Sequence, residues 1–255
     1  MGPELLSGIL ALSAYGAYEY GKDLPFHYIT QTDHAICHWM NGTFCGRISY
    51  IVMAIIIYTL YIISTKALSV PVQNALQDPP KNGIAGLGIG AAIATVSIGL
   101  NILFGFIELK GIDYKKLLLI PIIVTGMVMT GFTEELVFRA LPINALRPYV
   151  SEHILVFGTA LLFGYVHAGY SLYYGVSAFI AGLLLGYGFL KYGLYWAAGL
   201  HTAFNTVETS FYTVFQHKVK NAFLAGERKT PDDDGLTSAF VEGLALLALK
   251  YTGYL

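Results

Sequence analysis

The chain has 255 residues, of which 55% are hydrophobic and only 12% are charged, and its formal net charge is −1. Soluble domains average about a quarter charged residues, so this composition excludes an ordinary soluble protein and indicates a polytopic membrane protein. No run of basic residues is long enough for a nucleic-acid-binding arm, and no nucleic-acid partner is expected. We expect a single integral membrane domain over residues 1–255.

The N-terminal part of the chain contains one weak apolar segment and one hydrophilic loop. Residues 3–20 are short for a membrane span and carry Glu4 and Glu19, so the segment either spans the bilayer or lies in the interface. In the loop that follows, Cys37 and Cys45 flank a glycosylation sequon. A disulfide on an oxidising face and a pair of free thiols beside a chance sequon are equally good interpretations.

Six longer segments each hold about 20 mostly apolar residues, enough to cross a bilayer as a helix. Backbone polar groups in hydrocarbon must be bonded internally, so we expect an all-α fold: a transmembrane bundle of about eight helices, counting one weak segment at each terminus. The six segments cover residues 48–66, 84–107, 117–141, 152–169, 172–190 and 193–215.

The connections and the C-terminal segment are less apolar. The late loop 216–235 contains the acidic run Asp232-Asp233-Asp234, which we interpret as a solvated loop. The last segment, 236–254, carries Glu242 and Lys250 and either spans the membrane or lies in the interface as an amphipathic helix.

Two pairs of glycines are spaced four residues apart within the apolar segments. One pair is Gly86 with Gly90, and the other is Gly182 with Gly186. Small residues at this spacing let membrane helices approach closely, so both pairs predict helix contacts inside the bundle.

The sequence leaves the orientation in the membrane open. With eight spans, the loops at 20–47, 107–116 and 216–235 share one side and hold nine Lys and Arg residues. The positive-inside rule favours the cytoplasm for that side, whereas the cysteines and the sequon favour the exterior.

Ionisable side chains are rare inside the long apolar segments. A charge near the bilayer centre costs about 2.5–3.5 kcal/mol on insertion scales, so each such group needs a partner or a purpose. Polar groups also serve as packing contacts between helices, and each residue taken alone indicates function no more than structure. The set is Glu134, Glu135, Arg139, His167, His201 and Glu208.

Helical spacing distinguishes the three charges of the 117–141 segment. Glu135 and Arg139 are four residues apart with the acid first, the favourable order for an ion pair on one helix. Glu134 points about 100° away from Glu135 around the helix axis. We therefore expect a self-neutralised Glu135–Arg139 pair beside a Glu134 that has no partner on its own helix.

Two further helices carry polar pairs at the same spacing. Phe163 precedes His167 by four residues, and His201 precedes Asn205 by four. Glu208 lies near the same face as His201, seven residues on, and we expect it at the membrane interface. Three helices can thus present polar groups to a shared intramembrane cavity.

This set of residues can hydrolyse an amide without a covalent nucleophile. Glu134 could take a proton from a water held jointly with His167. His201 and Asn205 could donate hydrogen bonds to the oxyanion that forms when water attacks the carbonyl. The chain has no G-x-S-x-G elbow, and neither cysteine lies in a predicted helix, so a serine or cysteine protease is disfavoured.

The same residues match three motifs of a known family. EELVFR at 134–139 reads as EExxxR, Phe163–His167 reads as FxxxH, and His201–Asn205 reads as HxxxN, in that order on three predicted helices. Over about residues 117–210 the chain therefore resembles the CAAX prenyl protease 2 type, the CPBP (Abi) family of intramembrane glutamate proteases. Each motif is loose alone, but the three in order are fairly specific.

The resemblance implies an eight-helix membrane fold with a cavity open to one leaflet. It implies an intramembrane endopeptidase in which Glu134 and His167 activate the water while His201 and Asn205 form the oxyanion hole. The implied catalytic residues are Glu134, His167, His201 and Asn205, and the implied supporting residues are Glu135, Arg139 and Phe163.

Substrate and location also follow only from the resemblance. Family members of this type remove the last three residues of prenylated CaaX proteins, so the implied partners are such a protein, or another membrane-associated peptide, and the bilayer. The implied location is the cell membrane of a prokaryote or the endoplasmic reticulum of a eukaryote. Alternatives are a protease of the bacteriocin-processing or self-immunity type and a proton-coupled transporter, since buried Glu and His also serve transport.

No cofactor is expected, although a zinc site is an alternative. Glu134, His167 and His201 could ligate zinc, but the HExxH motif is absent. An asparagine and a second glutamate suit a site built from a water and an oxyanion hole better.

Overall fold

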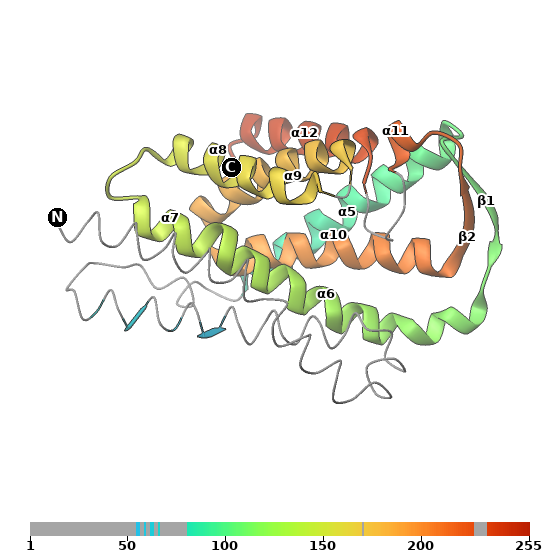
Figure 1. Ribbon diagram of the computed structural model, residues 1–255, viewed down its shortest axis with the longest axis horizontal. Coiled ribbons are helices and arrows are strands. Elements are labelled where there is room, and N and C mark those ends of the chain that lie inside the picture. The colour runs from blue at the N-terminus through green and yellow to red at the C-terminus, as the bar shows by residue number, and fades with distance from the viewer. Residues whose placement is uncertain are drawn as a thin grey trace.

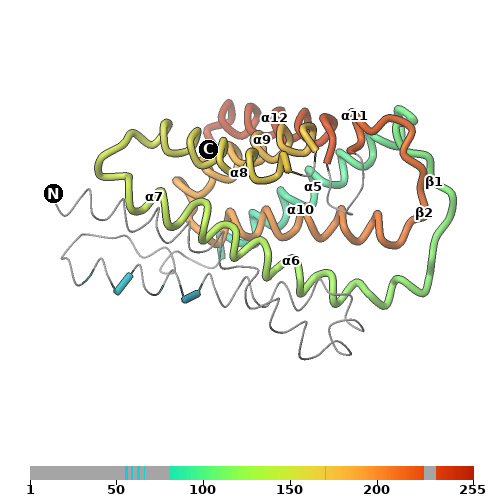
Figure 2. The backbone as a smooth tube through the Cα atoms, in the orientation of Figure 1, coloured from blue at the N-terminus to red at the C-terminus, as the bar shows by residue number. Residues whose placement is uncertain are grey.

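The computed structural model describes residues 81–169, 171–226 and 234–255, together with positions 55, 56, 59, 62, 63 and 66. These residues form a bundle of helices with a two-stranded sheet at one end (Figures 1 and 2). In chain order the elements are α5 (Asn82–Leu103), β1 (Ile107–Ile112), η2 (Tyr114–Leu119), α6 (Ile120–Glu135), η3 (Leu136–Ala140), α7 (Leu141–Leu146), α8 (Glu152–His167), α9 (Leu172–Tyr192), α10 (Leu194–Val214), β2 (Phe215–Val219), α11 (Ala222–Ala225) and α12 (Leu236–Tyr251).

The expected helical bundle is confirmed, and helix positions agree closely with the apolar segments. Helices α8, α9, α10 and α12 begin and end within three residues of their predicted bounds. Helix α5 ends earlier than expected, because Gly105 turns the chain with a φ of 70°. The predictions for residues 3–20 and for Cys37 and Cys45 lie outside the described residues, and the six described positions of 48–66 are helical.

Three stretches of the described chain are long and apolar enough to cross a membrane: α5, the continuous run Tyr114–Leu146, and α9. Helix α8 has only 16 residues, and α10 is diluted by His201, Asn205, Glu208 and several threonines. The protein is therefore a membrane protein, and the predicted total of eight spans stays a prediction.

We expected residues 107–116 and residues 216–235 to form loops, and here the structure differs. Strand β1 pairs with β2 as an antiparallel ladder. Helices α5 and α10 lie side by side and end at the same side of the bundle (Figure 1). The chain segments that leave them therefore meet, and their backbone groups are satisfied by pairing.

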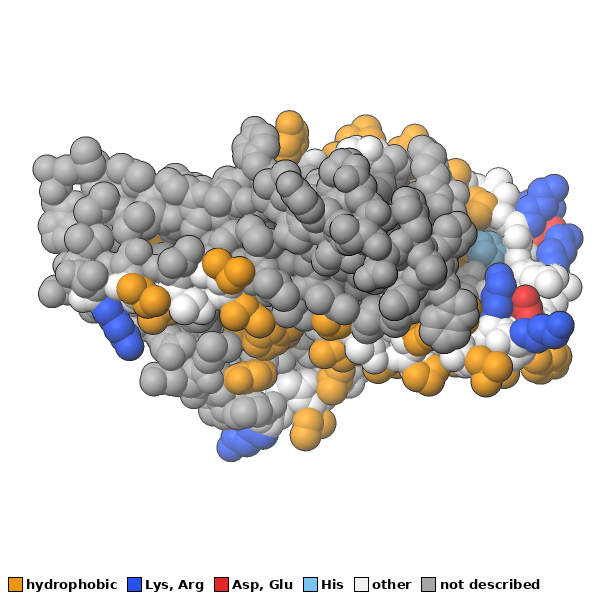
Figure 3. Space-filling view, turned by 60° about the horizontal axis from the view of Figure 1, so that its bottom comes forward, with side chains coloured by type: hydrophobic (Ala, Val, Ile, Leu, Met, Phe, Trp, Pro, Cys, Tyr) orange, Lys and Arg blue, Asp and Glu red, His pale blue; other side chains and the backbone are white. Residues whose placement is uncertain are grey.

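Charged side chains gather at the end of the molecule that holds this sheet, whereas apolar side chains cover much of the described surface beside it (Figure 3). Lys110 and Lys220 both bind the carboxylate of Glu108. These two contacts, of which the one with Lys110 has the larger effect, lower the pKa of Glu108 to about 2. The group therefore stays charged at neutral pH. Exposed apolar residues line α8 at helical spacing: Ile154, Phe157, Leu161 and Tyr165.

Glycines let α5 and α10 touch backbone to backbone. A Cβ atom added to Gly86 or Gly90 would lie 2.1 Å from a backbone carbonyl oxygen of α10. This is closer than non-bonded carbon and oxygen atoms can approach. The predicted contact role of this glycine pair is thereby confirmed. Helix α10 is the central helix of the bundle, packing against α5, α6 and α9.

The second glycine pair joins α9 to α8. A Cβ atom on Gly182 would meet Cα of Ala160 at 2.8 Å, and one on Gly186 would meet Val156 at 2.9 Å. On another face of α9, Gly188 leaves room for the fully buried indole of Trp196. These contacts fix α8 and α10 around α9, and both helices carry predicted site residues.

Replacing Gly90 with alanine should destabilise the protein, because the methyl group has to displace the α10 backbone. We expect a loss of about 1–3 kcal/mol, seen as a lower midpoint of thermal unfolding in detergent. Gly88 is the matched control, since a Cβ atom there meets nothing within 4 Å and alanine favours the helix. Equal effects of Gly90→Ala and Gly88→Ala would contradict this account.

Candidate functional site

The site begins where α6 passes into a π-helical turn. Glu134 and Glu135 are the last residues of α6, and Arg139 lies in the π turn η3. Single π turns are rare within helices and are frequent at functional sites. One turn before the two glutamates, Gly131 lets α6 approach α10, because a Cβ atom there would lie 2.6 Å from the Thr202 hydroxyl.

The predicted ion pair within the helix is confirmed. Arg139 Nη1 donates to Glu135 Oε1 over 2.9 Å, and both side chains are completely buried. The guanidinium carbon also lies 4.3 Å from the centroid of the Phe163 ring, a cation–π contact. Arg139 thus binds both a carboxylate and an aromatic face, which are the partners that a guanidinium favours away from water.

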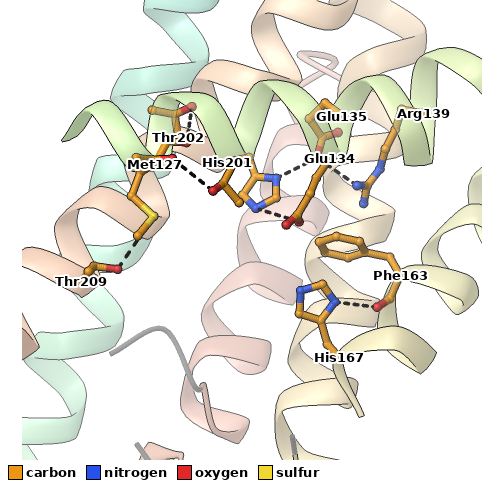
Figure 4. Close-up of polar contacts among 11 residues, drawn as sticks. Met127, Glu134, Glu135, Arg139, Phe163, His167, His201, Thr202 and Thr209 are labelled. Atoms are coloured by element: carbon orange, nitrogen blue, oxygen red, sulfur yellow. Dashed lines mark hydrogen bonds and ion pairs between the residues drawn. The ribbon is translucent and has the colours of Figure 1, made fainter. Parts of the chain in front are cut away.

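Glu135 has a second partner that spacing along one helix could not predict. His201 Nδ1 lies 2.8 Å from the same Oε1 atom, and His201 Nε2 lies 3.7 Å from Glu134 Oε2. Figure 4 shows the His201 imidazole between the two carboxylates, with the Phe163 ring below them. Among the described residues, the ion-pair contact recorded for Glu134 is with His201 on α10 and not with a residue of its own helix.

These contacts determine how His201 can carry protons. Glu135 accepts from Arg139 and acts as a carboxylate, so His201 Nδ1 carries the proton in their hydrogen bond. A neutral ring then has a bare Nε2, which can only accept. Nε2 can donate only when the ring is an imidazolium.

His167 lies on α8, beside Phe163. Its Nδ1 donates to the Phe163 backbone carbonyl over 2.8 Å, so in the neutral ring Nε2 carries no proton and is an acceptor. The two rings lie 4.3 Å apart, and Phe163 also makes an edge contact with His201 at 5.8 Å. The Phe163 ring therefore separates and positions both histidines.

A pocket lies next to these residues. It has a volume of about 480 Å³ with its open mouth included, and His167, His201 and Asn205 all line it. Glu134 is not among the lining residues, and its side chain keeps 23% of its surface exposed. The structure thus brings three of the four predicted catalytic residues to one pocket. Glu134 lies outside the pocket lining, with its Oε2 atom 3.7 Å from His201 Nε2.

Sequence reasoning missed several other polar residues that line this pocket. Ser177 and Tyr174 of α9, Glu242 of α12, and Asp234 just before α12 also line it. Asp234 is only 4% exposed, so the solvated-loop interpretation was wrong for this residue. A single carboxylate in the apolar segment 236–254 was a usable signal for Glu242.

Glu208 is completely buried among the helices. Its expected position at the depth of the membrane interface stays a prediction. Two turns separate it from His201 on the same helix, and α5 and α6 cover that helix. It does not line the pocket.

The zinc alternative requires three ligands at one point. In the described part of the chain, no three His, Cys, Asp or Glu side chains converge in that way. Glu134 and His201 are close to one another, while His167 is turned toward the Phe163 carbonyl. This geometry gives the zinc alternative no support.

A comparison with known families agrees with the motifs. Residues 116–207 match the family described as type II CAAX prenyl endopeptidase Rce1-like, and this range closely overlaps the motif-bearing core at 117–210. Neither a curated protein nor a solved structure matches the chain. The matched range includes every predicted site residue, so the resemblance indicated by the motifs is confirmed.

Removing Arg139 should destabilise the fold far more than removing an exposed arginine. Arg139→Ala leaves the buried Glu135 with less compensation, a loss of about 3–5 kcal/mol for a buried pair. Arg147→Ala is the control, since Arg147 pairs with Glu152 where both side chains are over 40% exposed, and such pairs contribute about 0–1 kcal/mol. Thermal unfolding in detergent separates the two, and similar midpoints would refute the assigned role of Arg139.

Proposed function

We propose, from the premise that residues 116–207 belong to the type II CAAX prenyl endopeptidase Rce1-like family, that this membrane protease hydrolyses peptide bonds with a water activated by Glu134. The observation that carries the proposal is the position of His201. Its imidazole contacts the carboxylates of both Glu134 and Glu135 and also lines the pocket. It therefore connects a base to a place where a peptide can bind.

In the proposed reaction, Glu134 is the general base. Its carboxylate takes one proton from a water as the water oxygen attacks the carbonyl carbon of the peptide bond. The partly exposed side chain of Glu134 gives water access to it. His167, whose neutral ring carries no proton on Nε2, holds the same water by accepting its second hydrogen there.

The attack converts the carbonyl oxygen into an oxyanion. His201 donates to this oxyanion from Nε2 as an imidazolium, and the Asn205 side-chain amide donates from one turn further along α10. The proton on Glu134 then passes to the amide nitrogen, the carbon–nitrogen bond breaks, and an acid and an amine are released. No covalent intermediate forms, and Glu134 returns to its carboxylate.

Glu135, Arg139 and Phe163 act as positioning residues in this scheme. Glu135 fixes the His201 tautomer through Nδ1, as a carboxylate does for many functional histidines. Arg139 pairs with Glu135 and holds it in place, and Phe163 separates the two imidazoles.

For substrate, we propose a prenylated CaaX protein, from which the enzyme releases the last three residues. Support comes from the family and from the apolar residues that line most of the pocket, such as Ile93, Leu184 and Phe204. A protease with a different membrane-bound substrate would share the same site chemistry, so substrate choice needs its own test.

Glu134→Gln should abolish hydrolysis while the protein still folds, because an amide cannot accept the water proton. Removal of a general base lowers the rate by about 10²–10⁴-fold, and we expect kcat to fall by at least about 10³-fold. Glu152→Gln, an exposed glutamate on α8, is the control and should retain full activity. Wild-type turnover by Glu134→Gln would eliminate the glutamate mechanism.

The substrate class is tested with two peptides that differ only in a farnesyl group on the CaaX cysteine. The purified protein in lipid should release the tripeptide from the farnesylated peptide and leave the other intact, as followed by mass spectrometry. Equal cleavage of both peptides would leave the protease assignment standing and reject the prenyl specificity.

Metal chelators should leave the activity unchanged, since the proposed water is bound by Glu134 and His167 alone. The measurement is the cleavage rate after dialysis against 1,10-phenanthroline, compared with its non-chelating 1,7 isomer. A loss of activity with the first compound only, restored by added zinc, would replace the proposed mechanism with a metal-dependent one.

A further inference from the structure

The pocket has a second polar wall that no motif of the chain accounts for. Glu242 lies on α12, outside the matched range 116–207, yet it lines the pocket together with His201 and Asn205. We propose that Glu242 binds the amino group that peptide-bond hydrolysis releases, so that the leaving segment is held by its nitrogen. This inference rests on the proposed function.

The arrangement of the helices sets Glu242 across the pocket from the oxyanion donors. Helices α5 and α9 each pack against both α10 and α12, so α10 and α12 face one another with the pocket between them. His201 and Asn205 come from α10, and Glu242 comes from α12. A bound peptide therefore meets hydrogen-bond donors on one side and a carboxylate on the other.

A peptide bond fits these two walls in one orientation. In a trans peptide the C=O and N–H bonds lie in one plane and point in opposite directions. When the carbonyl oxygen points to His201 and Asn205, the N–H group points to the wall that carries Glu242. Hydrolysis turns this nitrogen into an amine, which gains a proton and becomes a cation beside the carboxylate.

The carboxylate of Glu242 is suited to such a cation. It is only 3% exposed, and Ser177 donates one hydrogen bond to it over 3.3 Å. No lysine or arginine is found among the described residues that line the pocket, while a second acid, Asp234, is among them. An amine that enters the pocket thus meets two acidic side chains in a largely apolar surrounding, where a hydrogen bond between an ammonium and a carboxylate is strong.

The test is equilibrium binding of two product-like peptides to the purified wild-type protein, measured by isothermal titration calorimetry. One is the amide of the tripeptide Leu-Leu-Ala with a free amino group, and the other is its N-acetyl form, so the two differ at the amino group alone. We expect the free amine to bind about tenfold more tightly. Equal binding, or tighter binding of the acetylated form, overturns the proposal.

The variant Glu242→Gln should reduce this preference to within about twofold, whereas the exposed control Glu152→Gln should keep it. An unchanged preference in Glu242→Gln overturns the assignment. If Glu242→Gln does not fold, the wild-type comparison still decides. Binding needs no turnover, so a protein that prefers the amine but cleaves no peptide would refute the proposed function and not this inference.

Discussion

The site depends on one buried carboxylate oxygen. Oε1 of Glu135 accepts hydrogen bonds from both Arg139 and His201, at 2.9 and 2.8 Å. The first bond pairs the opposite charges of Glu135 and Arg139, which lowers the cost of burying them in the bundle. The second joins α6 to α10 and leaves Nε2 as the nitrogen of His201 that lies beside Glu134. Structural stability and the chemistry of the site therefore rest on the same atom.

Close helix packing makes this contact possible. Gly131 brings α6 against α10 one turn before Glu135, and Gly86 and Gly90 press α10 against α5 from the other side. Without these glycines the backbones would separate by roughly the thickness of a methyl group, and a 2.8 Å bond between side chains on different helices would be lost. The glycines and the motif residues thus both contribute to the contact between Glu135 and His201, although they lie in different segments of the sequence.

Local spacing explains what could be predicted. Helix positions followed from apolar runs, and the Glu135–Arg139 pair followed from four-residue spacing, since both are decided within one helix. The contact between Glu135 and His201 joins residues 66 positions apart, and no periodicity along one helix contains it. The place of Glu242 in the pocket was missed for the same reason, because most of that pocket is made by other helices.

The charge balance of the site explains why two adjacent glutamates are tolerated there. Glu134 and Glu135 contribute two negative charges, and Arg139 contributes one positive charge. In a medium of low polarity an uncompensated charge is costly, and the contacts of Glu135 with Arg139 and His201 offset part of that cost. His201 also contacts Glu134, so one imidazole serves both carboxylates. The side chain that the proposed reaction uses as an oxyanion donor is therefore also the one that joins the two glutamates to α10.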